Sequence, residues 1–275
     1  YVSDNIGYIY AYNYNENKII WAKKYKIPFR SNIKLFSDKI VTSNQNNDFY
    51  VFEKKSGNLV KLIPSEETII NNSFINNISL SDEKIFFLNT YGSLYSIDQN
   101  SLKSDWFINF NKFSDLSLSS LFYGSNVINF KNKILLSSNQ NFYFIDAVNG
   151  AVISKKKFSS FFKPIAVNEY VFLITKNNYL ISMKLRNGDI IYSYDITQKV
   201  ANYLNTNKKD LVIKDFMMVN NKLLIFLKNS FVVKFDIRGE IEEVFKLPSS
   251  LKTRPIIVNN SLMYLNKKNR FLIRN

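Results

Sequence analysis

Short runs of apolar and aromatic residues recur along the chain in a constant phase. Seven of them have strand length: 8–13, 49–53, 94–98, 142–146, 180–184, 232–236 and 271–275. The last residues of these runs are 40, 45, 48, 38, 52 and 39 residues apart. A period of about 40–45 residues made of strands is typical of a β-propeller, in which each repeat forms one four-stranded blade.

The phase extends beyond each run. A turn residue stands four positions after several of the run ends (Asn17, Gly57, Gly150 and Gly188), and Gly239 stands one position early. Eight positions after the end stands Trp21, Trp106 or Tyr192, and the two tryptophans are the only ones in the chain. A large flat side chain at a fixed place on an outer strand is suited to wedge one sheet against the next, so we interpret these three aromatic residues as structural.

The strands of one repeat can be counted between residues 159 and 195. Four runs of strand composition, 163–167, 170–174, 179–183 and 190–194, are separated by short polar joints, which indicates one antiparallel blade. The second run is apolar at almost every position, as expected where both faces of a sheet are covered. No stretch shows a long helical period, so no helix is expected. The longest irregular stretch, 197–214, is expected to project as a loop.

Both ends of the chain fall inside a repeat. Tyr1 starts in an expected second strand and Asn275 ends an expected third strand. Propellers commonly close by pairing strands from both termini, because an unpaired edge exposes hydrogen-bonding groups. We therefore expect residues 1–275 to form a single all-β propeller domain that is incomplete at its N-terminus, with the missing strand upstream of Tyr1.

The net charge of +15, from 37 basic and 22 acidic residues, could attract nucleic acid or an anionic membrane. The basic residues are scattered at about one small group per repeat, which favours a solvated rim that resists sheet-to-sheet association and argues against a nucleic-acid partner. The longest apolar runs have only strand length, so no membrane-spanning helix is expected.

Most catalytic arrangements are excluded by composition. The chain contains no His and no Cys, so it can build neither a Ser-His-Asp nor a Cys-His arrangement, nor an ordinary zinc site. The adjacent pairs Glu66-Glu67 and Glu242-Glu243 adjoin turns or an outer strand and are expected to be exposed. Asp146 and Asp236 have no clustered partner for a metal ion. We therefore expect no catalytic residue, no metal site and no cofactor.

The repeat unit of strand, Asp, turn, Gly and Trp resembles that of pyrroloquinoline-quinone (PQQ) propellers, as in 94–98 followed by Trp106 and in Asp146 followed by Gly150. Among these, the layout is most similar to the BamB family of outer-membrane β-barrel assembly lipoproteins. That resemblance implies an eight-bladed ring of which the last seven repeats are visible here. It also implies a non-enzymatic scaffold on the periplasmic face of the bacterial outer membrane, attached by a lipid anchor upstream of Tyr1.

In that family, loops between successive blades contact the barrel-forming partner BamA, and one loop carries a segment of the type Ser-Asp-Val-Asp. Ser114-Asp115-Leu116-Ser117 corresponds to it, with Asp115 at the first acid and Ser117 in place of the second. The loop before the previous blade would lie beside it and offers Ile69 and Ile70. The resemblance thus implies a partner-binding face with Asp115, Leu116, Ser117, Ile69 and Ile70, and unfolded outer-membrane proteins as clients.

Two alternatives stay open. The chain could be a fragment of a PQQ-dependent quinoprotein dehydrogenase, which shares the repeat, although those enzymes often carry adjacent cysteines that are missing here. It could also be a propeller that binds cell-wall polymer or another anionic ligand through its basic rim.

Overall fold

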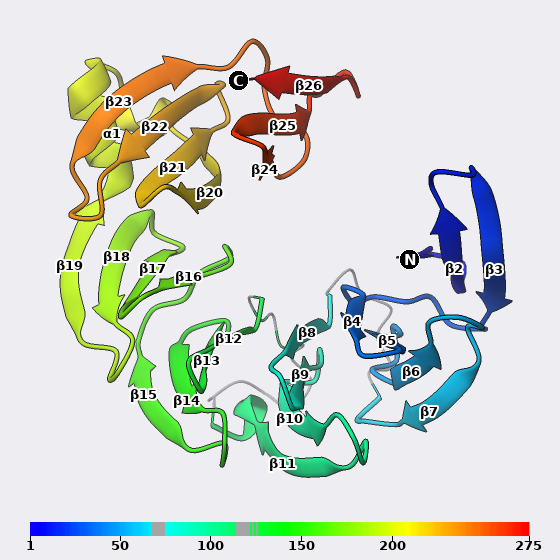
Figure 1. Ribbon diagram of the computed structural model, residues 1–275. Helices are drawn as coiled ribbons and strands as arrows, with labels where there is room; N and C mark the ends of the chain where they lie inside the picture. Colours follow the sequence, from blue (N-terminus) through cyan, green and yellow to red (C-terminus); the bar gives the residue numbers. More distant parts are fainter. Residues whose placement is uncertain (68–74, 114–121, 123, 125, 275) are drawn as a thin grey trace. The chain divides into compact units, whose positions relative to one another are not determined.

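The structure is a computed structural model, and it describes residues 1–67, 75–113, 122, 124 and 126–274. The chain divides into two compact units, Tyr1–Lys163 and Pro164–Asn275. Both units consist of antiparallel sheets in which strands adjacent in sequence are paired (Figure 1).

The first unit contains four of these sheets. They are β1 (Val2–Ser3), β2 (Tyr8–Asn13) and β3 (Lys18–Lys24); β4 (Lys34–Phe36), β5 (Lys39–Ser43), β6 (Phe49–Glu53) and β7 (Leu59–Ile63); β8 (Asn77–Leu80), β9 (Lys84–Leu88), β10 (Ser93–Asp98) and β11 (Ser104–Asn109); and β12 (Ile128–Phe130), β13 (Lys133–Ser137), β14 (Phe142–Asp146) and β15 (Val152–Lys156). A 3-10 helix, η1 (Phe110–Phe113), follows β11.

The second unit contains three sheets. They are β16 (Ile165–Val167), β17 (Tyr170–Ile174), β18 (Tyr179–Lys184) and β19 (Ile190–Asp195); β20 (Ile213–Val219), β21 (Lys222–Leu227), β22 (Phe231–Phe235) and β23 (Ile241–Lys246); and β24 (Ile256–Val258), β25 (Ser261–Leu265) and β26 (Phe271–Arg274). Helix α1 (Ile196–Leu204) and the 3-10 helix η2 (Lys208–Asp210) lie between β19 and β20.

These sheets confirm the expected all-β propeller fold with seven repeats. Within the described ranges, five sheets have four strands, whereas β1–β3 and β24–β26 have three. Each of the seven periodic runs forms a strand, and the four strands counted between residues 159 and 195 are β16 to β19. An eighth repeat upstream of Tyr1 stays a prediction.

The core is built from the middle strands of each sheet. In β9, Ile85, Phe86, Phe87 and Leu88 are each at most 1% exposed, so both faces of this strand are covered. Phe86 and Leu88 pack in a cluster with residues of β13 and β14, while Ile85 and Phe87 pack in a cluster with residues of β5 and β6. The apolar second strand of the repeat therefore contributes alternate residues to two cores, one on each side of its sheet.

The outer strand of six sheets carries a β-bulge at the same place in the repeat. In each case one residue has no partner across the ladder: Ile20, Val60, Asp105, Ile153, Ile191 and Glu242. A bulge increases the local twist and redirects the side chains that follow it. In three of the six strands the next residue is the repeat aromatic, Trp21, Trp106 or Tyr192.

These aromatic side chains pack on the glycine turn of the following sheet. A Cβ atom added to Gly57 would lie 2.6 Å from Cε3 of Trp21, and one added to Gly150 would lie 2.8 Å from Cε3 of Trp106. Both glycines also have positive φ (69° and 77°), which favours glycine. Glycine is therefore favoured at these positions for two reasons: the backbone is left-handed, and an aromatic ring lies too close for a Cβ atom.

The same rings donate a hydrogen bond to a carbonyl of that turn. Trp21 Nε1 lies 3.0 Å from the Lys54 oxygen, and Trp106 Nε1 lies 3.0 Å from the Val148 oxygen. In the second unit, Tyr192 Oη donates to the Ile237 oxygen at 2.8 Å. We refer to this combination of ring, glycine turn and carbonyl as the aromatic lock.

Three of the six bulged outer strands lack the repeat aromatic, and one of them, β7, shows what replaces the lock. The residue after the bulge in β7 is Lys61, and the turn residue of the next sheet is Leu102 instead of glycine. Leu102 takes a left-handed φ of 54°, is 6% exposed and joins the core cluster between the two sheets. Apolar burial of the leucine side chain offsets the backbone strain where no ring covers the turn.

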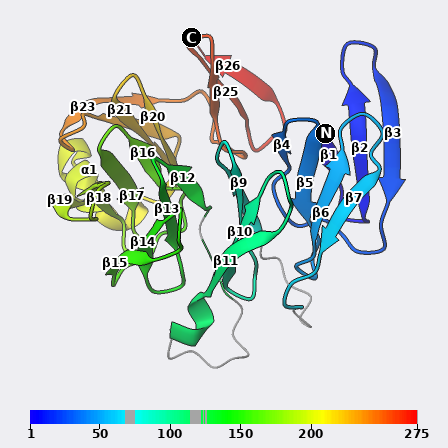
Figure 2. The ribbon, with the colours of Figure 1, turned by 60° about the horizontal axis from the view of Figure 1, so that its bottom comes forward.

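The expectation that 197–214 contains no helix was wrong. Asp195 caps helix α1 by accepting from the Gln198 amide at 3.0 Å, and Ile196, Thr197, Val200 and Ala201 are buried. The helix contacts β18 and β19, as Figure 2 also shows. Lys199 Nζ donates to the Gly239 oxygen at 2.8 Å, which ties the helix to the next sheet. Nine residues are too short for a helical period to stand out in the sequence.

The aromatic lock makes a prediction that compares Gly150→Ala with Gly188→Ala. Both glycines have positive φ, so each substitution carries a conformational penalty of about 1 kcal/mol. Trp106 packs on Gly150, whereas β15, the outer strand that comes before the sheet of Gly188 in the sequence, has Ser154 at the position of Trp106. We expect Gly150→Ala to lower the free energy of unfolding by a further ~1–3 kcal/mol, measured by denaturant titration.

The additional loss of unfolding free energy caused by Gly150→Ala should disappear when this substitution is made in a Trp106→Ala background. Equal destabilisation by Gly150→Ala and Gly188→Ala would contradict the lock.

Candidate partner-binding site

The five residues expected to bind a partner, Asp115, Leu116, Ser117, Ile69 and Ile70, lie outside the described residues. The chain on both sides of the two loops is described. These flanking segments, which we call the loop stems, are Ser65–Glu67 and Ile75–Asn76 for the first loop, and η1 and Phe122 for the second.

The first stem is anchored by the half-buried carboxylate of Glu66. Tyr95 Oη donates to it at 2.6 Å, Ser93 Oγ at 2.7 Å and Asn89 Nδ2 at 3.0 Å. All three donors belong to the next sheet, on β10 or on the turn before it. Glu66 therefore fixes the departing end of the first loop to the neighbouring sheet.

The returning stem of the first loop is anchored by Asn76, whose side chain is buried. Its Nδ2 donates to Ser43 Oγ at 2.6 Å and to the Asn44 oxygen at 2.9 Å, and its Oδ1 accepts from the Thr90 amide at 2.9 Å. Asn76 thus links the turn after β5 with the turn after β9.

The second loop is held at both ends by the same turn. Before it, the Phe110 amide donates to the Gly92 oxygen at 2.8 Å, and after it the Phe122 amide donates to the Thr90 oxygen at 2.9 Å. The two rings are 1% and 4% exposed and stack at 5.9 Å. Gly92 has a φ of 94°, and an added Cβ would lie 3.0 Å from the Phe122 ring, so this position requires glycine.

The turn 89–92, between β9 and β10, is therefore the common anchor of both loops. Asn89 bonds the Glu66 stem, Thr90 bonds both Asn76 and Phe122, and Gly92 bonds Phe110. The structure thus brings together the stems of two loops that begin about 45 residues apart in the sequence. Two loops anchored on one turn can present a single composite surface to a partner.

The electrostatics of this anchor keep Glu66 charged. Burial acts to raise the pKa of Glu66, but the donors Tyr95, Ser93 and Asn89 act against it and hold the pKa below its ordinary value. Burial, followed by the hydrogen bond and charge of Glu66, raises the pKa of Tyr95 far above its ordinary value. Tyr95 therefore remains protonated and stays a donor to the carboxylate.

The expectation that Glu66 is exposed was wrong, whereas its neighbour Glu67 is exposed. Two adjacent glutamates after a strand carry no local signal that separates them. The difference arises because only the Glu66 side chain reaches Ser93 and Tyr95, which are 27 and 29 residues away along the chain.

We predict that Glu66→Gln lowers the free energy of unfolding by about 1–3 kcal/mol at pH 7, since charged acceptors make the stronger hydrogen bonds. Because the pKa of Glu66 is lowered in the folded state, its contribution is present above the unfolded-state pKa and is lost as the pH falls through the folded-state pKa. The stability gap between wild type and variant should therefore narrow at acid pH in denaturant titrations.

Glu67→Gln is the matched control, and we expect it to leave the free energy of unfolding unchanged at both pH values. If the difference in free energy of unfolding between wild type and Glu66→Gln stays constant down to acid pH, the charge of Glu66 does not contribute to the anchor.

No helix in the described ranges is long and apolar enough to cross a membrane. A search of curated protein sequences finds no significant match. A family profile described as "Outer membrane protein assembly factor BamB" matches residues 1–194, which include four complete sheets of the first unit and most of the next.

Among solved structures, BamB from Moraxella catarrhalis is similar with a TM-score of 0.77 and 11% identity, over 98% of this chain and 80% of that chain. The computationally designed Ika8 protein has a TM-score of 0.72 and 9% identity, over 99% and 79% of the two chains. Quinohemoprotein alcohol dehydrogenase from Comamonas testosteroni has a TM-score of 0.59 and 11% identity, over 90% and 46%.

These likenesses to solved structures concern the fold. The profile match covers more than half of the chain and follows its repeats from the first sheet onward. The chain belongs to the BamB family of PQQ-repeat propellers.

Proposed function

We propose that this chain is a non-enzymatic scaffold that holds a BamA-like barrel-forming protein and assists the assembly of outer-membrane β-barrels. The observation that carries the proposal is the turn 89–92, which anchors the stems of both loops expected to bind the partner. Membership of the BamB family supports the same role. The proposed location is the periplasmic face of the outer membrane, with a lipid anchor outside these residues.

The anchoring has a direct consequence for binding. Association costs free energy for ordering loops at an interface, and stems already fixed to a packed sheet reduce that cost. In this proposal Asp115 pairs with a basic residue of the partner, while Ile69 and Ile70 supply apolar contact beside it. Leu116 and Ser117 complete the surface.

We predict that Asp115→Arg and Ile69→Asp each weaken binding to the soluble periplasmic domains of the BamA-like protein of the same organism at least tenfold, or about 1.4 kcal/mol. Charge inversion replaces attraction by repulsion, and an aspartate in an apolar contact loses its hydration on binding. Isothermal titration calorimetry measures both effects.

Matched controls carry the same changes in the second unit. Asp189→Arg and Val212→Asp alter exposed side chains and should leave the affinity within twofold of wild type. If the two loop variants bind as tightly as these controls, this face does not contact the partner.

A second part of the proposal concerns unfolded barrel precursors. Four outer strands at sheet edges expose a pair of aliphatic residues: Ile19 and Ile20 in β3, Leu59 and Val60 in β7, Val152 and Ile153 in β15, and Ile190 and Ile191 in β19. Each of these side chains is between 39% and 57% exposed. An edge strand with apolar side chains can bind an extended guest through main-chain hydrogen bonds, which tolerates many guest sequences.

We predict that Ile20→Lys combined with Ile191→Lys removes at least half of the ability to suppress aggregation of a urea-denatured porin on dilution, followed by light scattering. A charged residue at each edge should oppose strand addition. Tyr14→Lys combined with Val212→Lys, two exposed positions outside the edge strands, should keep the full effect. Equal loss in both double variants would contradict edge binding.

A further inference from the structure

The turn that leads into the periodic strand of each repeat differs in charge between the two units. We call it the entry turn, since it comes directly before β2, β6, β10, β14, β18, β22 or β26. The entry turns of the first unit contain two aspartates and no Lys or Arg; they are 4–7, 44–48, 89–92 and 138–141. The entry turns of the second unit, 175–178, 228–230 and 266–270, contain no acidic residue and five basic ones: Lys176, Lys228, Lys267, Lys268 and Arg270.

The three entry turns of the second unit lie along one end of its sheets. Each is paired with a segment that joins two neighbouring sheets, either 196–212 or 247–255. The pairings are the Ile196 amide to the Asn178 oxygen (3.0 Å), the Lys228 amide to the Val212 oxygen (2.8 Å), the Leu247 amide to the Ser230 oxygen (2.9 Å), and an antiparallel bridge between Leu251 and Asn266. The five basic residues therefore share one end of the second unit, which we call the basic face.

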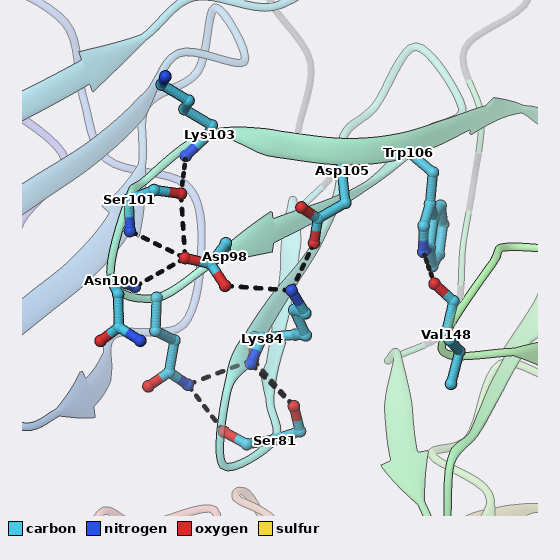
Figure 3. A network of polar contacts seen from close by, with 10 residues as sticks. Ser81, Lys84, Asp98, Asn100, Ser101, Lys103, Asp105, Trp106 and Val148 are labelled. Carbon is cyan, nitrogen blue, oxygen red and sulfur yellow. Dashed lines mark hydrogen bonds and ion pairs between the residues drawn. The ribbon is translucent and has the colours of Figure 1, made fainter.

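The charges of the basic face are not neutralised by ion pairs. Four of its five basic side chains are exposed and form no ion pair with another described residue: Lys228, Lys267, Lys268 and Arg270. Lysines at the opposite end of the sheets do form such pairs. Lys84, at the start of β9, pairs with Asp98 at 3.1 Å and with Asp105 at 2.7 Å (Figure 3). Lys222, at the start of β21, pairs with Glu242. The basic face thus keeps an excess of positive charge, which attracts an anionic partner.

A second feature of the same turns is the aromatic residue that starts the strand after them. In the first unit the two phenylalanines at this place, Phe49 and Phe142, are 0% exposed. In the second unit Tyr179 is 43% exposed and Phe271 is 58% exposed. Two entry turns of the basic face therefore carry an exposed ring within three residues of a basic side chain.

Basic residues together with exposed aromatic rings are typical of surfaces that contact the headgroup region of a membrane. Turns on three successive sheets can also contact one extended surface at the same time. Four of the five basic residues are lysines, whose compact charge is suited to a diffuse anionic surface. Arginine, with its planar fork, is better suited to pair with single carboxylates, so an acidic protein segment fits this face less well.

We propose that the basic face binds the surface of an anionic phospholipid bilayer. The basic side chains lie against the headgroup phosphates, and the rings of Tyr179 and Phe271 enter the interface beside them. The basic face belongs to the second unit, whereas the loops proposed to bind a barrel-forming protein belong to the first. The two proposals are therefore tested separately.

The test is co-sedimentation of the full chain with vesicles made of equal parts of phosphatidylglycerol and phosphatidylcholine. Vesicles of pure phosphatidylcholine are the neutral counterpart. We expect the chain to bind the anionic vesicles and not the neutral ones. Raising the ionic strength from about 0.01 M to about 1 M shortens the Debye length from about 30 Å to about 3 Å, and it should weaken the binding by about tenfold or more.

The double variant Lys228→Glu/Lys268→Glu should weaken binding to the anionic vesicles by about tenfold or more. Its matched control, Lys184→Glu/Arg186→Glu, makes the same change in net charge with two exposed residues at the opposite end of β18, and it should bind within about twofold of wild type. The proposal is overturned if neutral vesicles bind equally well, if the basic-face variant binds like wild type, or if the control loses as much affinity. Binding to poly-L-glutamate without binding to the anionic vesicles would overturn it too, because the face would then recognise acidic protein.

Discussion

Within each of the two units, the packing of an outer-strand ring onto the glycine turn of the next sheet fixes consecutive sheets to one another wherever the repeat aromatic is present. A bulge directly before Trp21, Trp106 and Tyr192 redirects each ring, the glycine leaves room for it, and a turn carbonyl accepts a hydrogen bond from it. Because the ring needs the glycine and the glycine needs the ring to fill its space, the two positions are coupled across about 40 residues of chain. Leu102 shows the alternative solution, in which a strained leucine fills the space itself.

Regular packing between sheets makes the loop anchor possible. The turn 89–92 holds its place because β9 and β10 are buried on both sides, and polar groups on that turn then bind the stems of two separate loops. Glu66 acts across the boundary between two sheets, where its charge is satisfied by three donors. In the proposed function, the blades supply the rigidity needed for binding and the loops supply the recognition.

The residue type at the bulge position of the outer strand differs between repeats, and this difference changes the surface. At the bulge position, four strands expose an aliphatic side chain, and these positions form the proposed edges for unfolded clients. Asp105 and Glu242 stand at the same position in β11 and β23, and they form ion pairs with Lys84 and Lys222, the first residues of β9 and β21. The same β-bulge therefore supports two kinds of surface, because the bulge directs the side chain and the residue type decides its chemistry.

The sequence by itself determined the number of repeats, the strands of each repeat and the place of the outer aromatic residues, because these follow from the local alternation and period of apolar side chains. Only the tertiary structure decided that Glu66 is an anchor while Glu67 is exposed, that α1 forms against β18 and β19, and that Lys84 pairs with both Asp98 and Asp105. Each of these depends on residues far apart in the chain, and local patterns do not record which distant groups a side chain will meet.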